Sequence, residues 1–201
     1  INNIYNDCLS VSELVSIRLR LAISLLIANN HKEALEHFKI IVNKHCYHSC
    51  KVYNNMGICY AKLNKHKEAI EAFLNAKRIQ PNYNICNYNL ANCYIENREY
   101  NKALEILEKE SSQNDIPLKL AVCYTYLGDY DKAILKYNEI IEKTDDNNMR
   151  FNLSLIYLKI GNLSKGLEYY EYRHKVLNNL IENIGVKHWD GCICNNLLVI
   201  N

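Results

Sequence analysis

The 201-residue chain is 49% hydrophobic and 23% charged, a balance typical of a soluble folded protein. Its 24 basic and 22 acidic residues are spread along the whole chain, so the net charge is only +2 and the basic stripe that nucleic acid binding requires is absent. No run approaches the roughly 18 apolar residues of a membrane-spanning helix. We therefore expect neither nucleic acid nor a membrane as a partner.

Residues 1–14 are predicted to be an N-terminal helix or leader. They lack the basic and apolar regions of a secretion signal, and they begin without Met, which suggests a piece of a longer polypeptide. Nine Cys, an odd number, are scattered along the chain rather than arranged as a disulfide framework. We expect free thiols and a reducing, intracellular (cytoplasmic) compartment.

A 34-residue unit repeats along the chain, and its clearest copy runs from Cys50, taken as position 1, to Tyr83. Large, small and aromatic residues, with one Pro, occupy positions 4, 7, 8, 11, 20, 24, 27 and 32 of this copy: Tyr53, Met56, Gly57, Tyr60, Ala69, Phe73, Ala76 and Pro81. This pattern resembles the signature of the tetratricopeptide family at all eight positions. The resemblance implies a helix–turn–helix in each unit and a right-handed solenoid built by stacking the units.

Units in register with this copy begin near residues 15, 50, 84, 114 and 147. They share a small residue at position 8, namely Ala22, Gly57, Ala91, Ala121 and Ser154. The spacing falls to 30 residues between the third and fourth starts. We therefore expect a shortened second helix or a tight loop near residues 110–113. The array is predicted to span residues 15–180.

The spacing within each unit places positions 4, 7, 8 and 11 on one face of a first helix and positions 17, 20, 24 and 27 on one face of a second. One helix pair cannot bury such faces alone, so neighbouring pairs must share a continuous core. The fold class is therefore predicted to be all-α. Residues at positions 10 and 11 are expected to pack in this core: Cys59, Cys93 and Cys123, and Tyr60, Tyr94, Tyr124 and Tyr157.

The first helices of such a solenoid line its concave surface, which is the usual binding face. By resemblance to the family, the candidate peptide-binding residues are Arg20, Lys51, Asn54, Asn55, Lys62, Tyr88, Asn89, Asn92, Lys119, Tyr126, Phe151, Asn152 and Lys159, with Glu96 on the same face. Asn offers both a donor and an acceptor, so a row at position 6 (Asn55, Asn89, Asn152) could hold a peptide backbone. A row of solvated Asn side chains is the alternative.

The sequence contains no Gly-rich phosphate loop, no nucleophile–base pairing and no paired acids in an apolar setting. We expect no catalytic residue, no cofactor and no metal. The segment from His45 to Cys50, with His48 and Cys46, has residue types that zinc could use, but its cramped spacing favours an ordinary loop between repeats.

Residues 181–201 form a non-repeat tail that could cap the last helix pair. Three short motifs follow one another here: Glu171, Tyr172 and Arg173, then Trp189, Asp190 and Gly191, and then a strand-like run at 197–200. This series resembles the junction between tetratricopeptide repeats and a heptosyltransferase-like glycosyltransferase domain. The resemblance implies a catalytic domain beyond residue 201.

The sequence thus predicts a protein–protein interaction module that binds extended peptide segments. The alternatives are a substrate-recruiting arm of a glycosyltransferase and a scaffold that oligomerises through the ends of the stack. The identity of the partner and the oligomeric state are left open.

Overall fold

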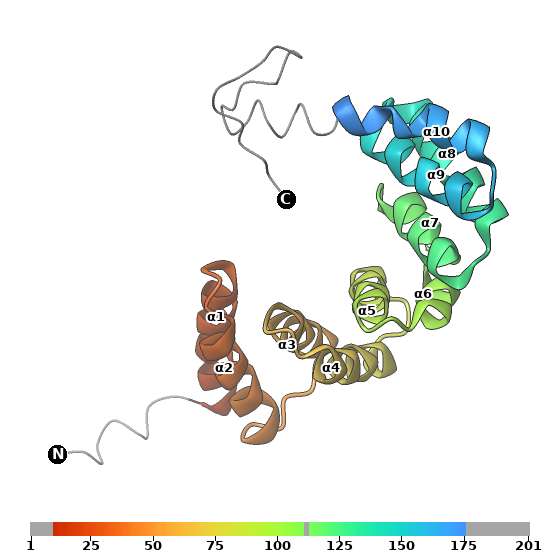
Figure 1. The fold of residues 1–201 in the computed structure, drawn as a ribbon. Helices are drawn as coiled ribbons and strands as arrows, with labels where there is room; N and C mark the ends of the chain where they lie inside the picture. Colours follow the sequence, from red (N-terminus) through yellow and green to blue (C-terminus); the bar gives the residue numbers. More distant parts are fainter. Residues whose placement is uncertain (1–9, 111–112, 176–201) are drawn as a thin grey trace, which may run out of the picture. The chain divides into compact units, whose positions relative to one another are not determined.

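The computed structural model describes residues 10–110 and 113–175, and these residues form ten α-helices (Figure 1). In chain order they are α1 (Val11–Ile27), α2 (His31–Asn43), α3 (Cys50–Lys62), α4 (His66–Ile79), α5 (Asn84–Glu96), α6 (Tyr100–Leu107), α7 (Ile116–Leu127), α8 (Tyr130–Thr144), α9 (Asn147–Lys159) and α10 (Leu163–Tyr170). Within the described part of the chain, none of these helices is long and apolar enough to cross a membrane.

The predicted all-α class is confirmed, and the helices follow one another in sequential pairs. Three first helices, α3, α5 and α9, begin at Cys50, Asn84 and Asn147, the residues from which the repeats were counted. Helix α7 begins two residues after Asn114, and α1 begins at Val11, ahead of Val15.

The chain divides into two compact units, residues 1–127 and 128–201. In the first unit each helix from α1 to α6 packs against the next helix in the chain. Helices α3, α5 and α7 lie along one side of this unit, and α4 and α6 along the other (Figure 1). In the second unit α9 packs against both α8 and α10.

Small residues at positions 8 and 20 allow the two helices of a pair to approach closely. Gly57 lies so near α4 that a Cβ atom placed on it would come within 2.5 Å of the Phe73 ring. The partner positions are buried as expected, at Ala34, Ala69, Ala103, Ala133 and Gly166. The three Cys at position 10 are buried, and so are Tyr94, Tyr124 and Tyr157, whereas Tyr60 is half-buried.

A left-handed residue separates the two helices in every repeat, at position 15. The five residues there, with φ between 58° and 82°, are Asn29, Asn64, Arg98, Gly128 and Gly161. A residue with positive φ ends a helix by turning the chain while its N–H group satisfies a terminal carbonyl. The sequence alone does not reveal this position, because Asn and Arg occupy it in three repeats and Gly in only two.

Helix α6 is only 8 residues long, against 13 to 15 residues for α2, α4 and α8. This confirms the shortened second helix that the spacing of the repeats predicts. The helix ends at Leu107, just before residues 110–113, where this repeat is shorter than the other copies.

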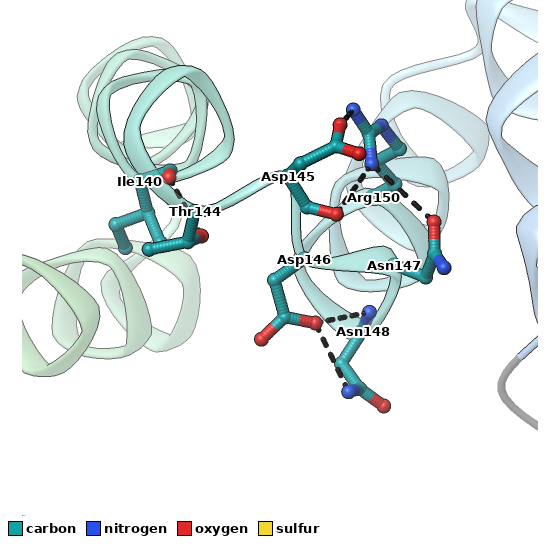
Figure 2. A network of polar contacts seen from close by, with 7 residues as sticks. All are labelled: Ile140, Thr144, Asp145, Asp146, Asn147, Asn148 and Arg150. Carbon is teal, nitrogen blue, oxygen red and sulfur yellow. Dashed lines mark hydrogen bonds and ion pairs between the residues drawn. The ribbon is translucent and has the colours of Figure 1, made fainter. Parts of the chain in front are cut away.

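The junction between α8 and α9 is held by a polar network (Figure 2). Asp145 is left-handed, with φ 54°, and its N–H donates to the carbonyl of Ile141 at 2.9 Å. The guanidinium of Arg150 pairs with the Asp145 carboxylate and also donates to the Asp145 carbonyl at 2.9 Å. The Asp146 carboxylate accepts from the backbone N–H of Asn148 at 2.7 Å and so caps the start of α9.

Candidate functional site

Two Asn side chains join α3 to α5. The Asn89 amide nitrogen donates to the Asn54 amide oxygen at 3.2 Å, and Asn54 is only 3% exposed. The prediction that Asn54 lines an open groove is therefore wrong. Position 5 of this first helix points toward the next first helix, where a buried carboxamide needs a partner from the protein. Asn89 remains half-buried at the surface with one of its donors already engaged.

A pocket of about 430 Å³ lies where α3, the start of α4 and α5 meet. Its lining residues are Ile58, Ala61, Lys62, Asn64, His66, Phe73, Asn89, Asn92, Cys93 and Glu96. Three of the predicted binding residues, Lys62, Asn89 and Asn92, are brought together here. Asn64 and His66 are not among the predicted residues, because Asn64 lies in the turn and His66 in the second helix, whereas the prediction considers only first helices.

Two residues of this lining each have a buried polar atom without a hydrogen-bond partner among the described residues. The two atoms are the Asn92 amide oxygen and Nδ1 of His66. An unsatisfied buried polar atom costs roughly 1–3 kcal/mol, so such atoms call for an explanation. The exposed side chains of Lys62 and Glu96 add charges of opposite sign to the lining.

A second cluster, formed by Tyr88, Asp115 and Lys119, connects α5 to the start of α7. The Tyr88 hydroxyl donates to the Asp115 carboxylate at 2.5 Å, and Lys119 Nζ lies 3.3 Å from the same oxygen and 5.3 Å from the centre of the Tyr88 ring. Burial would raise the pKa of the Asp115 carboxyl, but the hydrogen bond from Tyr88 and the charge of Lys119 hold it below its usual value. These contacts engage both Tyr88 and Lys119 within the protein.

The remaining predicted residues of the first unit lie apart from the pocket lining. Arg20 and Lys51 are exposed and Asn55 is half-buried. Tyr126 is exposed and stacks face to face on Tyr100, with ring centres 4.7 Å apart.

The other three predicted residues belong to the second unit, on α9. The Phe151 ring packs against Tyr170 with centres 5.7 Å apart, and Lys159 Nζ lies 5.4 Å from the centre of the Tyr130 ring. Asn152 is half-buried. Phe151 thus contributes to the packing of α9 against α10.

In the described part of the chain, no group of three or more His, Cys, Asp or Glu side chains could hold a metal ion. In the segment considered for zinc, Nδ1 of His48 lies 2.8 Å from the Tyr53 hydroxyl, and the Cys50 thiol donates to Gln80 at 3.0 Å. The tail motifs around Trp189, and residues 181–201 as a whole, lie outside the described residues.

The sequence matches family models of the tetratricopeptide repeat at residues 50–83, 86–109 and 118–144. BBSome complex member BBS4 of Bos taurus is 33% identical over 112 residues, which cover 53% of this chain and 21% of that protein. BBS4 of Mus musculus is 28% identical over 145 residues, covering 69% and 27% respectively. The chain therefore spans about a quarter of the length of these relatives.

Solved structures of MamA share the fold. MamA 41-end from Desulfovibrio magneticus RS-1 superimposes with a TM-score of 0.73 at 17% identity, covering 84% of this chain and 96% of that one. A MamA RS-1 double mutant gives a TM-score of 0.74 at 15% identity, covering 86% and 99%. These comparisons lend no support to the resemblance of the tail to a glycosyltransferase junction. The repeat matches and the helix pairs agree: the chain contains tetratricopeptide repeats.

Proposed function

We propose that this chain is a protein-interaction module that binds an extended peptide segment along the first helices of residues 1–127, anchored in the pocket between α3 and α5. The observation that carries the proposal is the buried, unpartnered amide oxygen of Asn92 in that pocket. The BBS4 relatives are named as members of a complex, which supports a protein as the partner.

The lining defines the chemistry of the anchoring group. The Asn92 oxygen needs a donor, which a backbone N–H or a side-chain amide of a peptide supplies. Ile58, Ala61 and Phe73 provide apolar contacts for the rest of the group. A volume of about 430 Å³ suits one or two residues of a peptide rather than a folded surface.

The proposal is tested by selecting binders from a library of random linear peptides displayed on phage, using the whole chain as bait. A selected peptide is then titrated calorimetrically against the wild type and against Asn92→Ala. Losing one hydrogen bond should weaken binding by about 3- to 10-fold. Asn101→Ala, the same change at an exposed site on α6, is the matched control and should bind like the wild type.

A second measurement separates binding from structure. Because the Asn92 oxygen has no partner among the described residues, Asn92→Ala should leave the melting temperature of the free protein unchanged or slightly higher. A variant that loses both stability and affinity would indicate a structural role for Asn92. Equal peptide affinity for Asn92→Ala and the wild type would overturn the anchoring role of the pocket.

A further inference from the structure

A second pocket, of about 300 Å³, lies where α2, α3 and α4 meet, and it shares no lining residue with the pocket between α3 and α5. Helix α3 contributes Tyr60 to its lining, and α4 contributes Glu68 and Glu71. The carboxylates of Glu68 and Glu71 are exposed and form no ion pair within the described chain. Lys39 of α2 also lines the pocket, but its Nζ is paired with Glu36 at 2.9 Å. The unpaired charge at this pocket is therefore negative.

Two other repeats show which group lies against the Tyr ring at position 11 of the repeat. Position 19 is Lys in the third and fifth repeats, and its ammonium lies 5.5 Å from the centre of that ring, as Lys102 over Tyr94 and Lys165 over Tyr157. A cation at this distance is attracted by the face of the ring. In the second repeat position 19 is Glu68 instead, and no cation of the described chain lies over the Tyr60 ring in this way. Tyr60 is half-buried, whereas the two rings that carry a Lys are buried. The pocket thus has the aromatic ring of this arrangement without its cation.

We infer that this pocket binds an arginine side chain of a partner protein, with the guanidinium against the Tyr60 ring and paired with the carboxylates of Glu68 and Glu71. The unpaired negative charge favours a cation, and a planar guanidinium can stack on a ring while it pairs with a carboxylate. Val42 and Met56 of the lining provide apolar contacts for the aliphatic stem of the arginine. This inference is independent of the peptide anchor proposed between α3 and α5.

The inference is tested by titrating the whole chain, labelled with nitrogen-15, with the peptide acetyl-Gly-Arg-Gly-amide and following the backbone amide signals by NMR. The signals around Tyr60 and Glu71 should shift and approach saturation at millimolar peptide, and added salt should weaken the binding because it screens exposed charges. The same peptide with citrulline in place of arginine has nearly the same shape without the charge, and it should cause no such shifts.

Glu68→Lys supplies the cation from within the chain, as Lys102 does over Tyr94, and it also removes a carboxylate. It should weaken binding of the arginine peptide by about 10-fold or more. Glu105→Lys is the matched control, because it makes the same change of charge at an exposed site on α6 outside this pocket. It should bind the arginine peptide like the wild type.

Tyr60→Leu tests the ring, because it introduces the residue that the first repeat carries at position 11, Leu25. Loss of the ring should weaken binding by about 2- to 5-fold. Circular dichroism confirms that each variant folds, and Glu68→Lys, at an exposed site, decides if Tyr60→Leu does not.

Three outcomes would overturn the inference. The first is an absence of shifts at up to about 10 mM arginine peptide, or equal shifts with the citrulline peptide. The second is equal weakening by Glu68→Lys and Glu105→Lys, which would indicate a general attraction between charges. The third is a set of shifts centred on Asn92, which would place the arginine in the other pocket.

Discussion

Gly57 of α3 lies against the Phe73 ring of α4. A Cβ atom there would lie 2.5 Å from the Phe73 ring, whereas the other first helices carry Ala or Ser at position 8. Phe73 fills the space that a side chain at position 57 would occupy.

We expect Gly57→Leu to lower the free energy of unfolding by about 1–3 kcal/mol, because the added side chain overfills this contact. Urea denaturation of the wild type and the variant measures the change. Lys51→Leu, an exposed substitution on the same helix, should shift stability far less. An unchanged midpoint for Gly57→Leu would contradict the assignment of position 8.

Gly161 tests the left-handed turn at position 15. It has φ 82°, and a Cβ atom built on it would have no heavy atom within 4 Å, so any penalty is conformational rather than steric. Gly161→Ala should destabilise the protein by about 1 kcal/mol. The reverse change, Arg98→Gly, relieves a left-handed Arg and should be neutral or mildly stabilising. Chemical denaturation measures the free energy of unfolding of both variants. An unchanged stability of Gly161→Ala would contradict a conformational requirement for Gly at this position.

The buried thiols make stability depend on pH at the alkaline end. Burial raises the pKa of Cys59, Cys93 and Cys123 to about 11. A thiol whose pKa is higher in the folded than in the unfolded protein stabilises the fold at pH values below its unfolded-state pKa. This stabilisation is lost as the pH rises toward the folded-state pKa. Stability should therefore fall from about pH 9 to about pH 11. Denaturation curves of the wild type and Cys59→Ala, recorded at a series of pH values, measure this fall. The free energy of unfolding of Cys59→Ala should decrease less steeply with pH, and an equally steep decrease would assign the fall to other groups.

At the scale of a helix, the start of α9 depends on one cap. The Asp146 carboxylate accepts from the Asn148 backbone N–H, beside the pair formed by Asp145 and Arg150 (Figure 2). Asp146→Ala should cost about 1 kcal/mol, because it leaves a helix N-terminal donor without its partner. Glu142→Ala, at an exposed site on α8, is the control for removing an acidic side chain. Thermal melts measure both variants, and equal melting temperatures would show that the cap does not stabilise the helix.

The short length of α6 agrees with the spacing of the repeats. Only 30 residues separate the repeat starts at 84 and 114. The apolar faces of the first helices fix where those helices lie, so the shortening must fall in the second helix or the loop, as the short α6 shows. The start of α1 is four residues earlier than the repeat count suggests. Ser10 explains this, since its side chain and Glu13 form a capping box that begins the helix there.

At the scale of the whole molecule, the repeat of the sequence and the compact units of the structure do not coincide. The boundary between the two units falls at Leu127 and Gly128, inside the repeat counted from residue 114. The repeats at the two ends differ from the internal ones in what they expose, namely Ile17 and Leu21 on α1 and Leu167 on α10.

The sequence by itself determined the helix pairs, the small residues at positions 8 and 20, and the burial of the Cys and most of the Tyr at positions 10 and 11. These features follow from spacing along one helix, which the chain carries locally. Only the tertiary structure decided that Asn54 is buried against Asn89, that Tyr88 and Lys119 share Asp115, and that Asn92 and His66 line one pocket. In the described chain, each of these last two residues has a buried polar atom without a hydrogen-bond partner. Such contacts depend on how neighbouring helices are aligned, because a side chain three or four ångströms away belongs to another helix, and periodicity within one helix does not encode that alignment.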